Sequence, residues 1–201
     1  WLVVLLAFLA SAYFATRWGW DEKKKLGFCE SSDGHRSWTN VLANGGLPGL
    51  VAVCAFLLDD WTNTFWVFVT AVAVAASDTW ASEFGCLDSR VRLIANRQSV
   101  PPGTNGGYSP IGQWAAFLGA AFISFTALIV GWVPATLDWE VGVILALCTT
   151  IIGWLGCQFD SFLGAMLENR GFLTKNSVNF SAITFGIGLA ILFILYSGIL
   201  V

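Results

Sequence analysis

Charged residues are scarce in this chain of 201 residues, at 11% of the total, whereas 56% of the residues are hydrophobic. With a mean hydropathy of +0.70, this composition excludes a soluble globular domain. The chain has one histidine and five cysteines without a CxxC pair or a Cys/His cluster, which argues against a zinc site. The first apolar run lacks a basic flank and a small-residue cleavage site, so we do not expect a signal peptide.

The chain contains several long apolar runs. Most of them reach or nearly reach the roughly 17–25 residues that cross a bilayer as a helix. The sequence therefore predicts an all-α fold, a polytopic transmembrane helix bundle of about six helices forming one integral-membrane domain over residues 1–201. The uncharged runs are Trp1–Thr16, Ser37–Leu58, Trp61–Ser77, Ile111–Leu137, Val141–Phe159 and Ser177–Val201.

The second run contains the unusual stretch Asn44-Gly45-Gly46-Leu47-Pro48-Gly49. Glycines and a proline inside a spanning helix predict a break or a kink, and irregular backbone in a membrane is tolerated where it lines a polar cavity. Close packing of helices through small residues is the alternative. Asn44 favours the cavity.

Charge placement predicts the orientation of the chain in the membrane. All ten basic residues fall between positions 17 and 36, 90 and 97, or 170 and 175. The two intervening turns, at Asp59-Asp60 and Asp138-Trp139-Glu140, carry acid and no base. Because basic loops remain on the cytoplasmic side, we expect the three basic loops to face the cytoplasm and both ends of the chain to face the opposite side.

Two aspartates, Asp78 and Asp160, each lie at the end of an apolar run. An ionisable residue at such depth is costly and indicates a functional site. On a helix, Asp78 and Ser82 would share one face, and so would Asp160 and Glu168. Carboxylates and hydroxyls suit a hard cation such as Mg²⁺. The alternative is that each aspartate is a helix end paired with Lys or Arg, but the occurrence of both favours a shared site.

A segment rich in proline and glycine, Pro101-Pro102-Gly103-Thr104-Asn105-Gly106-Gly107, ends the long loop over residues 85–110. Such a loop can expose consecutive backbone N–H groups next to the amino end of the following helix, which is an anion site of the kind that holds phosphate. A simple tight turn is the open alternative. Nearby basic and amide residues suit phosphate groups, with Arg36, Arg97, Arg170, Lys175, Asn176 and Asn179 as the candidates.

Three segments of the chain also resemble a known family. Ser77-Asp78-Thr79-Trp80-Ala81-Ser82-Glu83, Val100–Gly107 and Asp160-Ser161-Phe162-Leu163-Gly164-Ala165 are similar to the integral-membrane family of transmembrane protein 19 and plant phytyl-phosphate kinase, and the match extends to Arg36…Asn40–Gly45 and Asn176–Asn179. The order of the segments is more distantly similar to dolichol kinase and the phosphatidate cytidylyltransferases. This resemblance implies CTP as donor, Mg²⁺ as cofactor and a lipid-linked phosphate as acceptor.

Together these features predict a kinase that transfers the γ-phosphoryl group of CTP to an isoprenyl monophosphate. Asp78, Asp160 and Glu83 are the expected metal ligands, and Arg97 and Lys175 complete the expected catalytic set. Expected nucleotide or acceptor contacts are Gly103, Thr104, Asn105, Gly106, Gly107, Arg36, Arg170, Asn44, Ser161, Asn176 and Asn179.

Two other functions remain open at this point, a membrane cytidylyltransferase and a transporter for an anionic or isoprenoid substrate. The expected partners are the lipid bilayer, CTP and the isoprenyl phosphate, without nucleic acid. Whether the chain forms a homodimer is open.

Overall fold

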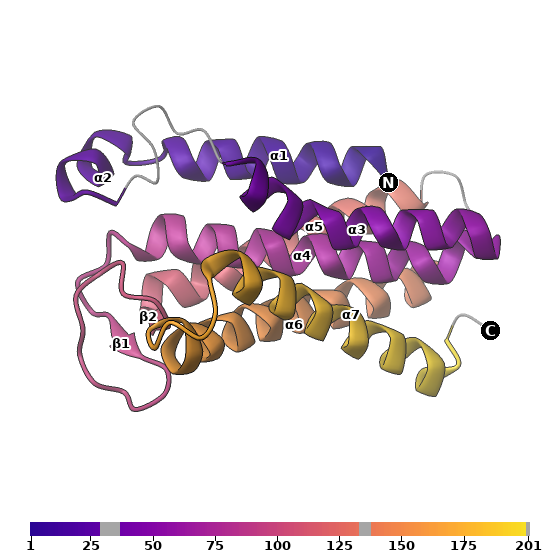
Figure 1. The fold of residues 1–201 in the computed structure, drawn as a ribbon. Coiled ribbons are helices and arrows are strands. Elements are labelled where there is room, and N and C mark those ends of the chain that lie inside the picture. The colour runs from indigo at the N-terminus through magenta and orange to yellow at the C-terminus, as the bar shows by residue number, and fades with distance from the viewer. Residues whose placement is uncertain (29–36, 133–137, 200–201) are drawn as a thin grey trace.

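A computed structural model describes residues 1–28, 37–132 and 138–199 (Figure 1). Helices dominate it, which confirms the all-α prediction. Two strands of two residues each form a small antiparallel ribbon in the loop before α5. In chain order the elements are α1 (Leu2–Arg17), α2 (Trp20–Leu26), α3 (Trp38–Leu58), α4 (Trp61–Gly85), β1 (Arg92–Leu93), β2 (Gly107–Tyr108), α5 (Pro110–Trp132), α6 (Trp139–Leu163), the π-helical turn η1 (Gly164–Glu168) and α7 (Lys175–Ser197).

Five of the described helices are long and apolar enough to cross a membrane, namely α3, α4, α5, α6 together with η1, and α7. The short helix α2 is bent by 61° from α1, and this pair makes a sixth span if it is counted as one. The count agrees with the bundle of about six helices expected from the apolar runs.

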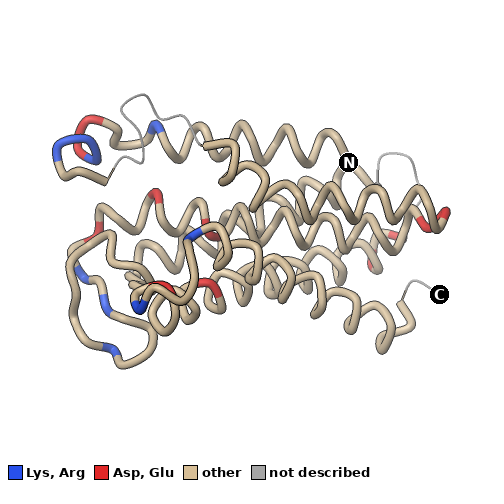
Figure 2. Tube along the Cα trace, viewed as in Figure 1, with Lys and Arg blue, Asp and Glu red and all other residues tan. Residues whose placement is uncertain are grey.

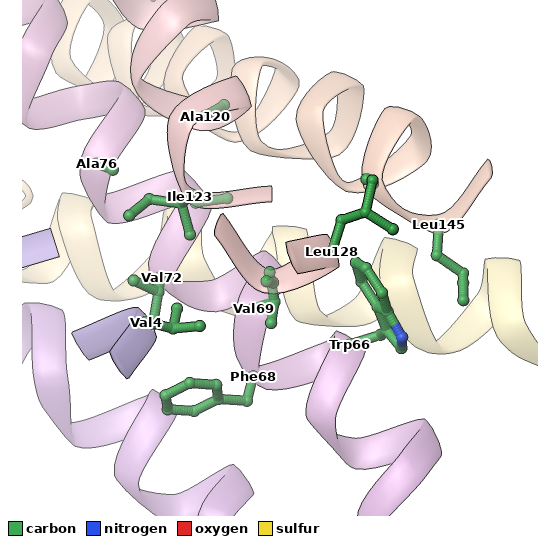
Figure 3. Close-up of a cluster of buried hydrophobic side chains, with 13 residues drawn as sticks. Val4, Trp66, Phe68, Val69, Val72, Ala76, Ala120, Ile123, Leu128 and Leu145 are labelled. Carbon is green, nitrogen blue, oxygen red and sulfur yellow. The ribbon is translucent and has the colours of Figure 1, made fainter. Parts of the chain in front are cut away.

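Helix α4 lies at the centre of the bundle and contacts α1, α3, α5, α6 and α7. Every residue from Trp66 to Ser77 is buried, so this part of α4 has no face toward lipid. Its side chains Val69 and Val72 join Val4 of α1, Ile123 of α5 and Leu145 of α6 in one apolar core (Figure 3).

Small residues let α6 and α7 approach α4 closely. A Cβ atom added at Gly156 of α6 would lie 2.6 Å from Val74 Cγ2, and one added at Gly186 of α7 would meet the same atom at the same distance. In a bilayer, where lipid is as apolar as leucine, such close backbone approach is a main source of helix association. These glycines therefore bring the ends of α6 and α7 next to the end of α4.

Helix α3 runs without a break from Trp38 to Leu58, with Pro48 inside it. Of the predicted break or kink, the break does not occur, since α3 continues as a single helix through this stretch. The polar surroundings expected for Asn44 are present. The Asn44 side chain is buried, it donates to the Asn40 carbonyl at 3.0 Å, and its Oδ1 accepts from Asn179 Nδ2 of α7 at 3.4 Å.

The described Lys and Arg residues lie at one end of the bundle, the end that carries α2 and the β1–β2 ribbon (Figure 2). The N-terminus and the end of α7 lie at the opposite end. The clustering of basic residues on one face agrees with the sequence. That this face is cytoplasmic stays a prediction.

The packing of α7 on α4 predicts a contrast between two glycines of the same helix. Gly186→Ala forces a methyl group against the stiff side chain of Val74, whereas a Cβ added at Gly188 meets nothing within 4 Å. Overpacking costs about 1–3 kcal/mol, while Gly→Ala in an open helix position gains up to about 1 kcal/mol. Thermal unfolding in detergent should show a lower midpoint for Gly186→Ala and an unchanged or higher one for Gly188→Ala.

Candidate functional site

A cavity of about 440 Å³ opens at the basic end of the bundle. Its wall combines the end of α1 with α2, the last turns of α4, the glycine-rich loop, the start of α5, the end of α6 with η1, and the start of α7. Polar or glycine residues that line it include Thr16, Lys23, Asn40, Asp78, Ser82, Glu83, Gly103, Thr104, Asn105, Gly106, Gly107, Gln113, Asp160, Ser161, Glu168, Lys175 and Asn179.

The two aspartates share this cavity, as their placement in the sequence predicts. Both lie inside helices, because α4 and α6 continue past the apolar runs to Gly85 and Leu163. Asp160 interacts electrostatically with Asp78, Glu168 and Lys175, so these four charges lie near one another. The Oδ2 atom of Asp160 is buried and has no hydrogen-bond partner in the described structure.

A buried carboxylate oxygen without a partner is costly unless a cation or a donor completes its environment. Mg²⁺ is bound by one or two protein carboxylates together with waters and substrate phosphates. Asp78 and Asp160 therefore fit Mg²⁺. Within the described ranges, no three Asp, Glu, His or Cys side chains form a metal-binding group by themselves, and Glu83 as a third ligand stays a prediction.

Glu83 has a cation as its partner. The Nζ atom of Lys23 donates to Glu83 Oε2 at 2.8 Å and to the Ala15 carbonyl at 2.8 Å, and the hydroxyl of Thr16 donates to Glu83 Oε1 at 2.8 Å. Lys23 is buried, with an exposed side-chain fraction of 2%. These bonds join α1 and α2 to α4 at the cavity wall and engage both oxygens of the Glu83 carboxylate.

The glycine-rich loop contains strand pairing and turn hydrogen bonds that the sequence did not predict. It lies between the paired strands β1 and β2, and Ile94 N donates to the Gly106 carbonyl at 3.0 Å. Within the loop, Thr104 N donates to the Pro101 carbonyl at 3.3 Å and Gly107 N to the Thr104 carbonyl at 2.9 Å. Two of the expected anion-binding N–H groups are thus used inside the turn.

The loop packs backbone against backbone on the start of η1, directly after α6. A Cβ atom added at Gly106 would lie 2.4 Å from Ala165 N, and one added at Gly164 would lie 3.0 Å from Gly106 N. Asn169 Nδ2 also donates to the Asn105 carbonyl at 2.9 Å. This contact holds the loop at η1, between Asp160 and Glu168 in the chain, and π-helical turns are frequent at functional sites.

The remaining predicted residues differ in where they lie relative to the cavity. Ser161, Lys175 and Asn179 line the cavity with the glycine loop. Asn44 lies behind the wall, bonded to Asn179. The residues that do not line the cavity are Arg97, on the exposed tip of the ribbon loop, and Arg170 and Asn176, beyond η1, while Arg36 lies outside the described residues.

Sequence reasoning missed three residues that shape the site. Lys23 stands in a run of three lysines, and nothing in the run indicates which one is buried. Gln113 lines the cavity and is held by Trp154 Nε1 and Gln158 Oε1 at 3.1 and 3.0 Å. Asp88 is buried and accepts from Arg90 N and from Ile111 N. Aspartate favours turns because its side chain can accept from the N–H two residues on. Asp88, in the loop after the fourth helix, could therefore have been predicted as a turn residue.

These features define the class of protein as a polytopic integral-membrane protein with a polar cavity at one end of its helix bundle. The chain belongs to the family of integral membrane proteins known as DUF92, whose model matches residues 1–190. This finding agrees with the family resemblance inferred from the aspartate and glycine motifs.

Several relatives match most of the chain. It is 34% identical over 187 residues to an uncharacterized membrane protein of Methanocaldococcus jannaschii, covering 92% of this chain and 72% of that protein. It is 31% identical over 193 residues to Protein PGR of Arabidopsis thaliana, covering 87% of this chain and 67% of that protein. It is 30% identical over 186 residues to an uncharacterized membrane protein of a Synechocystis strain, covering 88% of this chain and 67% of that protein. No solved structure matches the fold.

The contact of the glycine loop with η1 predicts that Gly106 cannot carry a side chain. Gly106 and Gly171 have similar positive φ angles of 74° and 76°, so alanine costs each of them about 1–2 kcal/mol of backbone strain. Only at Gly106 does the new methyl group also meet backbone, because a Cβ at Gly171 has nothing within 4 Å. Thermal unfolding should therefore show a clearly larger loss for Gly106→Ala than for Gly171→Ala, and equal losses would contradict the packing.

Asp88, outside the membrane spans, predicts an acid limit to stability. Its hydrogen bond with the Arg90 side chain, helped by the N–H groups of Arg90 and Ile111, lowers the pKa of Asp88 from 3.8 to about 2. A depressed folded-state pKa means that this stabilisation is complete above about pH 4 and is lost as the pH falls toward 2. Melting curves between pH 2 and 6 should show that Arg90→Gln moves this loss to higher pH, while Arg92→Gln leaves it in place.

Proposed function

We propose that this protein is a membrane phosphotransferase that uses CTP to convert an isoprenyl monophosphate into its diphosphate. The observation that carries the proposal is the buried Asp160 oxygen without a partner, in a cavity that also holds Asp78, the glycine loop and Lys175. Paired carboxylates, a glycine-rich loop and a cation at one membrane face are the parts that phosphoryl transfer requires. CTP and the isoprenyl acceptor come from the family resemblance.

Each group has a defined role in the proposed reaction. Asp78 and Asp160 would hold Mg²⁺, which when bound neutralises charge on the nucleotide phosphates. The loop Gly103–Gly107 and Lys175 would bind the phosphates of donor and acceptor. An oxygen of the acceptor phosphate attacks the γ-phosphorus, the bond from that phosphorus to the β-phosphate oxygen breaks, and CDP leaves. Because the attacking oxygen is already ionised, no protein nucleophile or general base is needed.

The place of the cavity suits an acceptor with a polar head and an apolar tail. It lies at the charged end of a bundle whose outer helix faces carry exposed apolar side chains, as expected for contact with lipid. The phosphate head would lie in the cavity while the isoprenyl tail stays in the hydrocarbon. Asn40 and Asn179, from α3 and α7, both line the cavity and offer uncharged contacts to the head group.

The alternatives differ in how well the geometry supports them. A transporter with a broken-helix site loses its main support, because α3 is one continuous helix and the acidic residues that line the cavity lie at the basic end of the bundle. Cytidylyl transfer would use the same groups, with attack on the α-phosphorus and release of pyrophosphate. The position of the transferred phosphorus separates this reaction from the kinase reaction.

Asp160→Asn tests the proposal, since the amide keeps the size of the side chain and removes its charge. Purified protein in lipid vesicles would be given an isoprenyl monophosphate, Mg²⁺, and CTP labelled at either the α or the γ position. We expect γ-label in the lipid product and a rate at least about a hundredfold lower for Asp160→Asn.

Asp138→Asn is the matched control, because Asp138 is an exposed helix cap at the opposite end of α6 and should keep full activity. Lipid labelled from the α position would replace the kinase by a cytidylyltransferase. If neither label reaches lipid, the enzyme proposal fails.

A further inference from the structure

Three buried asparagines, Asn40 and Asn44 of α3 and Asn179 of α7, form a row of hydrogen bonds beside the cavity. Asn44 Nδ2 donates to the main-chain carbonyl of Asn40 at 3.0 Å and to Asn40 Oδ1 at 3.3 Å. Asn179 Nδ2 donates to Asn44 Oδ1 at 3.4 Å. Asn40 and Asn179 line the cavity. The three side-chain amides are therefore one connected unit that joins two helices at the cavity wall.

The main-chain carbonyl of Asn40 fixes the direction of every bond in this row. A carbonyl oxygen only accepts, so the Asn44 atom that faces it must be the amide nitrogen. The Asn40 side-chain atom beside the same nitrogen must then be Oδ1. On the other side, Asn44 Oδ1 needs a donor, which is the amide nitrogen of Asn179. If one of these amides turned over, two donors or two acceptors would face each other.

This fixed direction leaves the amide nitrogen of Asn40 for the cavity. Oδ1 of Asn40 is bonded by Asn44, whereas Nδ2 makes no hydrogen bond within the described residues. Nor is Nδ2 one of their buried side-chain atoms without a partner. Because Asn40 lines the cavity, its two amide N–H groups are accessible from there. Asn40 therefore offers donors to a ligand, while the oxygen that would suit a cation is engaged by Asn44.

The helix ends around Asn40 also favour a negatively charged ligand. Helices α3 and α7 both begin at the cavity, since Asn40 in the first turn of α3 and Lys175 at the start of α7 line it. The amino end of a helix carries partial positive charge within its first turn. An N–H group that donates to an ionised oxygen forms a stronger bond than one that donates to a neutral oxygen. The surroundings of Asn40 thus suit an anionic oxygen.

We propose that Asn40 is a donor that binds an ionised phosphate oxygen in the cavity, and that Asn44 is the positioning residue that keeps its amide nitrogen toward the ligand. The inference deepens the proposed function and rests on it for the identity of the oxygen as that of a phosphate. That phosphate belongs to the nucleotide or to the lipid head group. An uncharged donor binds it without pairing with the nearby aspartates, which stay available to a cation.

Asn40→Asp tests the donor, because aspartate has nearly the same shape and still accepts from Asn44. Binding of inorganic pyrophosphate with Mg²⁺ would be measured by calorimetry on the detergent-purified chain, and binding of Mn²⁺ alone by electron paramagnetic resonance. We expect pyrophosphate affinity to fall about tenfold or more, the range of one hydrogen bond to a charged group. Mn²⁺ affinity should not fall, since the variant adds a carboxylate.

Asn96→Asp is the matched control for the added charge. Asn96 is exposed in the loop between β1 and β2, and aspartate keeps the bond that its Oδ1 accepts from Gln98 N. Pyrophosphate affinity should be unchanged in this variant. An unchanged affinity in Asn40→Asp, or a wild type that does not bind pyrophosphate, overturns the inference.

Asn44→Leu tests the positioning role, because leucine is close in size and removes both ends of the row. The Asn40 amide is then free to turn its oxygen to the cavity, and pyrophosphate affinity should fall about threefold to tenfold. In an Asn40→Ala background the same change should have no further effect, since no amide remains to be positioned. Losses that simply add would overturn the positioning role. If Asn44→Leu does not fold, Asn40→Asp decides the inference alone.

The source of the phosphate is separated by two further binding measurements on Asn40→Asp, with CTP and with an isoprenyl monophosphate, each with Mg²⁺. Weaker binding of CTP assigns Asn40 to the donor, and weaker binding of the isoprenyl monophosphate assigns it to the acceptor. Unchanged binding of both overturns the inference and leaves the proposed function standing. If Asn40→Asp loses pyrophosphate affinity but wild-type protein transfers no label to lipid, the phosphate contact stands and the proposed function fails.

Discussion

The cost of a charged carboxylate inside an apolar helix bundle is the constraint on which the rest of this structure depends. Asp160 has a buried oxygen without a hydrogen-bond partner, and it lies near Asp78 and Glu168, which bear like charges. Such an arrangement is stable only if something else completes it. The glycine loop and Lys175 line the same cavity as the two aspartates. This arrangement fits the proposed binding of a cation and phosphates.

The packing of the bundle brings these groups to one place. Helix α4 is buried on every side from Trp66 to Ser77, and the glycines of α6 and α7 lie directly against Val74. Because all three helices approach one another at the same level, their ends surround a common space. The loop is then seated on η1 through Gly106 and Gly164, and α2 is attached to α4 through Lys23 and Glu83. Stability and site geometry therefore come from the same close contacts.

Much of the site was predictable, and the failures have physical reasons. The cost of charge in hydrocarbon is enough to single out Asp78 and Asp160, and glycine-rich backbone before a helix is enough to single out the loop. The pairing of Glu83 with Lys23 was not predictable, because Lys23 is sixty residues away in the chain and looks like its exposed neighbours. The break expected in α3 did not occur, since a proline inside a helix can be accommodated when neighbouring helices support it. The order within the loop before α5 depends on the β1–β2 pairing and on Asp88, which bonds to Ile111 across 23 positions.

The sequence by itself determined the membrane class, the helix bundle, the gathering of basic residues at one end and the two aspartates, because hydrophobic run length and the cost of charge act locally along the chain. Only the tertiary structure decided which polar groups meet. It joined Glu83 to Lys23 and left an oxygen of Asp160 without a partner inside the cavity. It also placed Arg97 and Arg170 away from the cavity wall. Those outcomes depend on close approach between helices distant in sequence, which hydropathy and spacing do not encode.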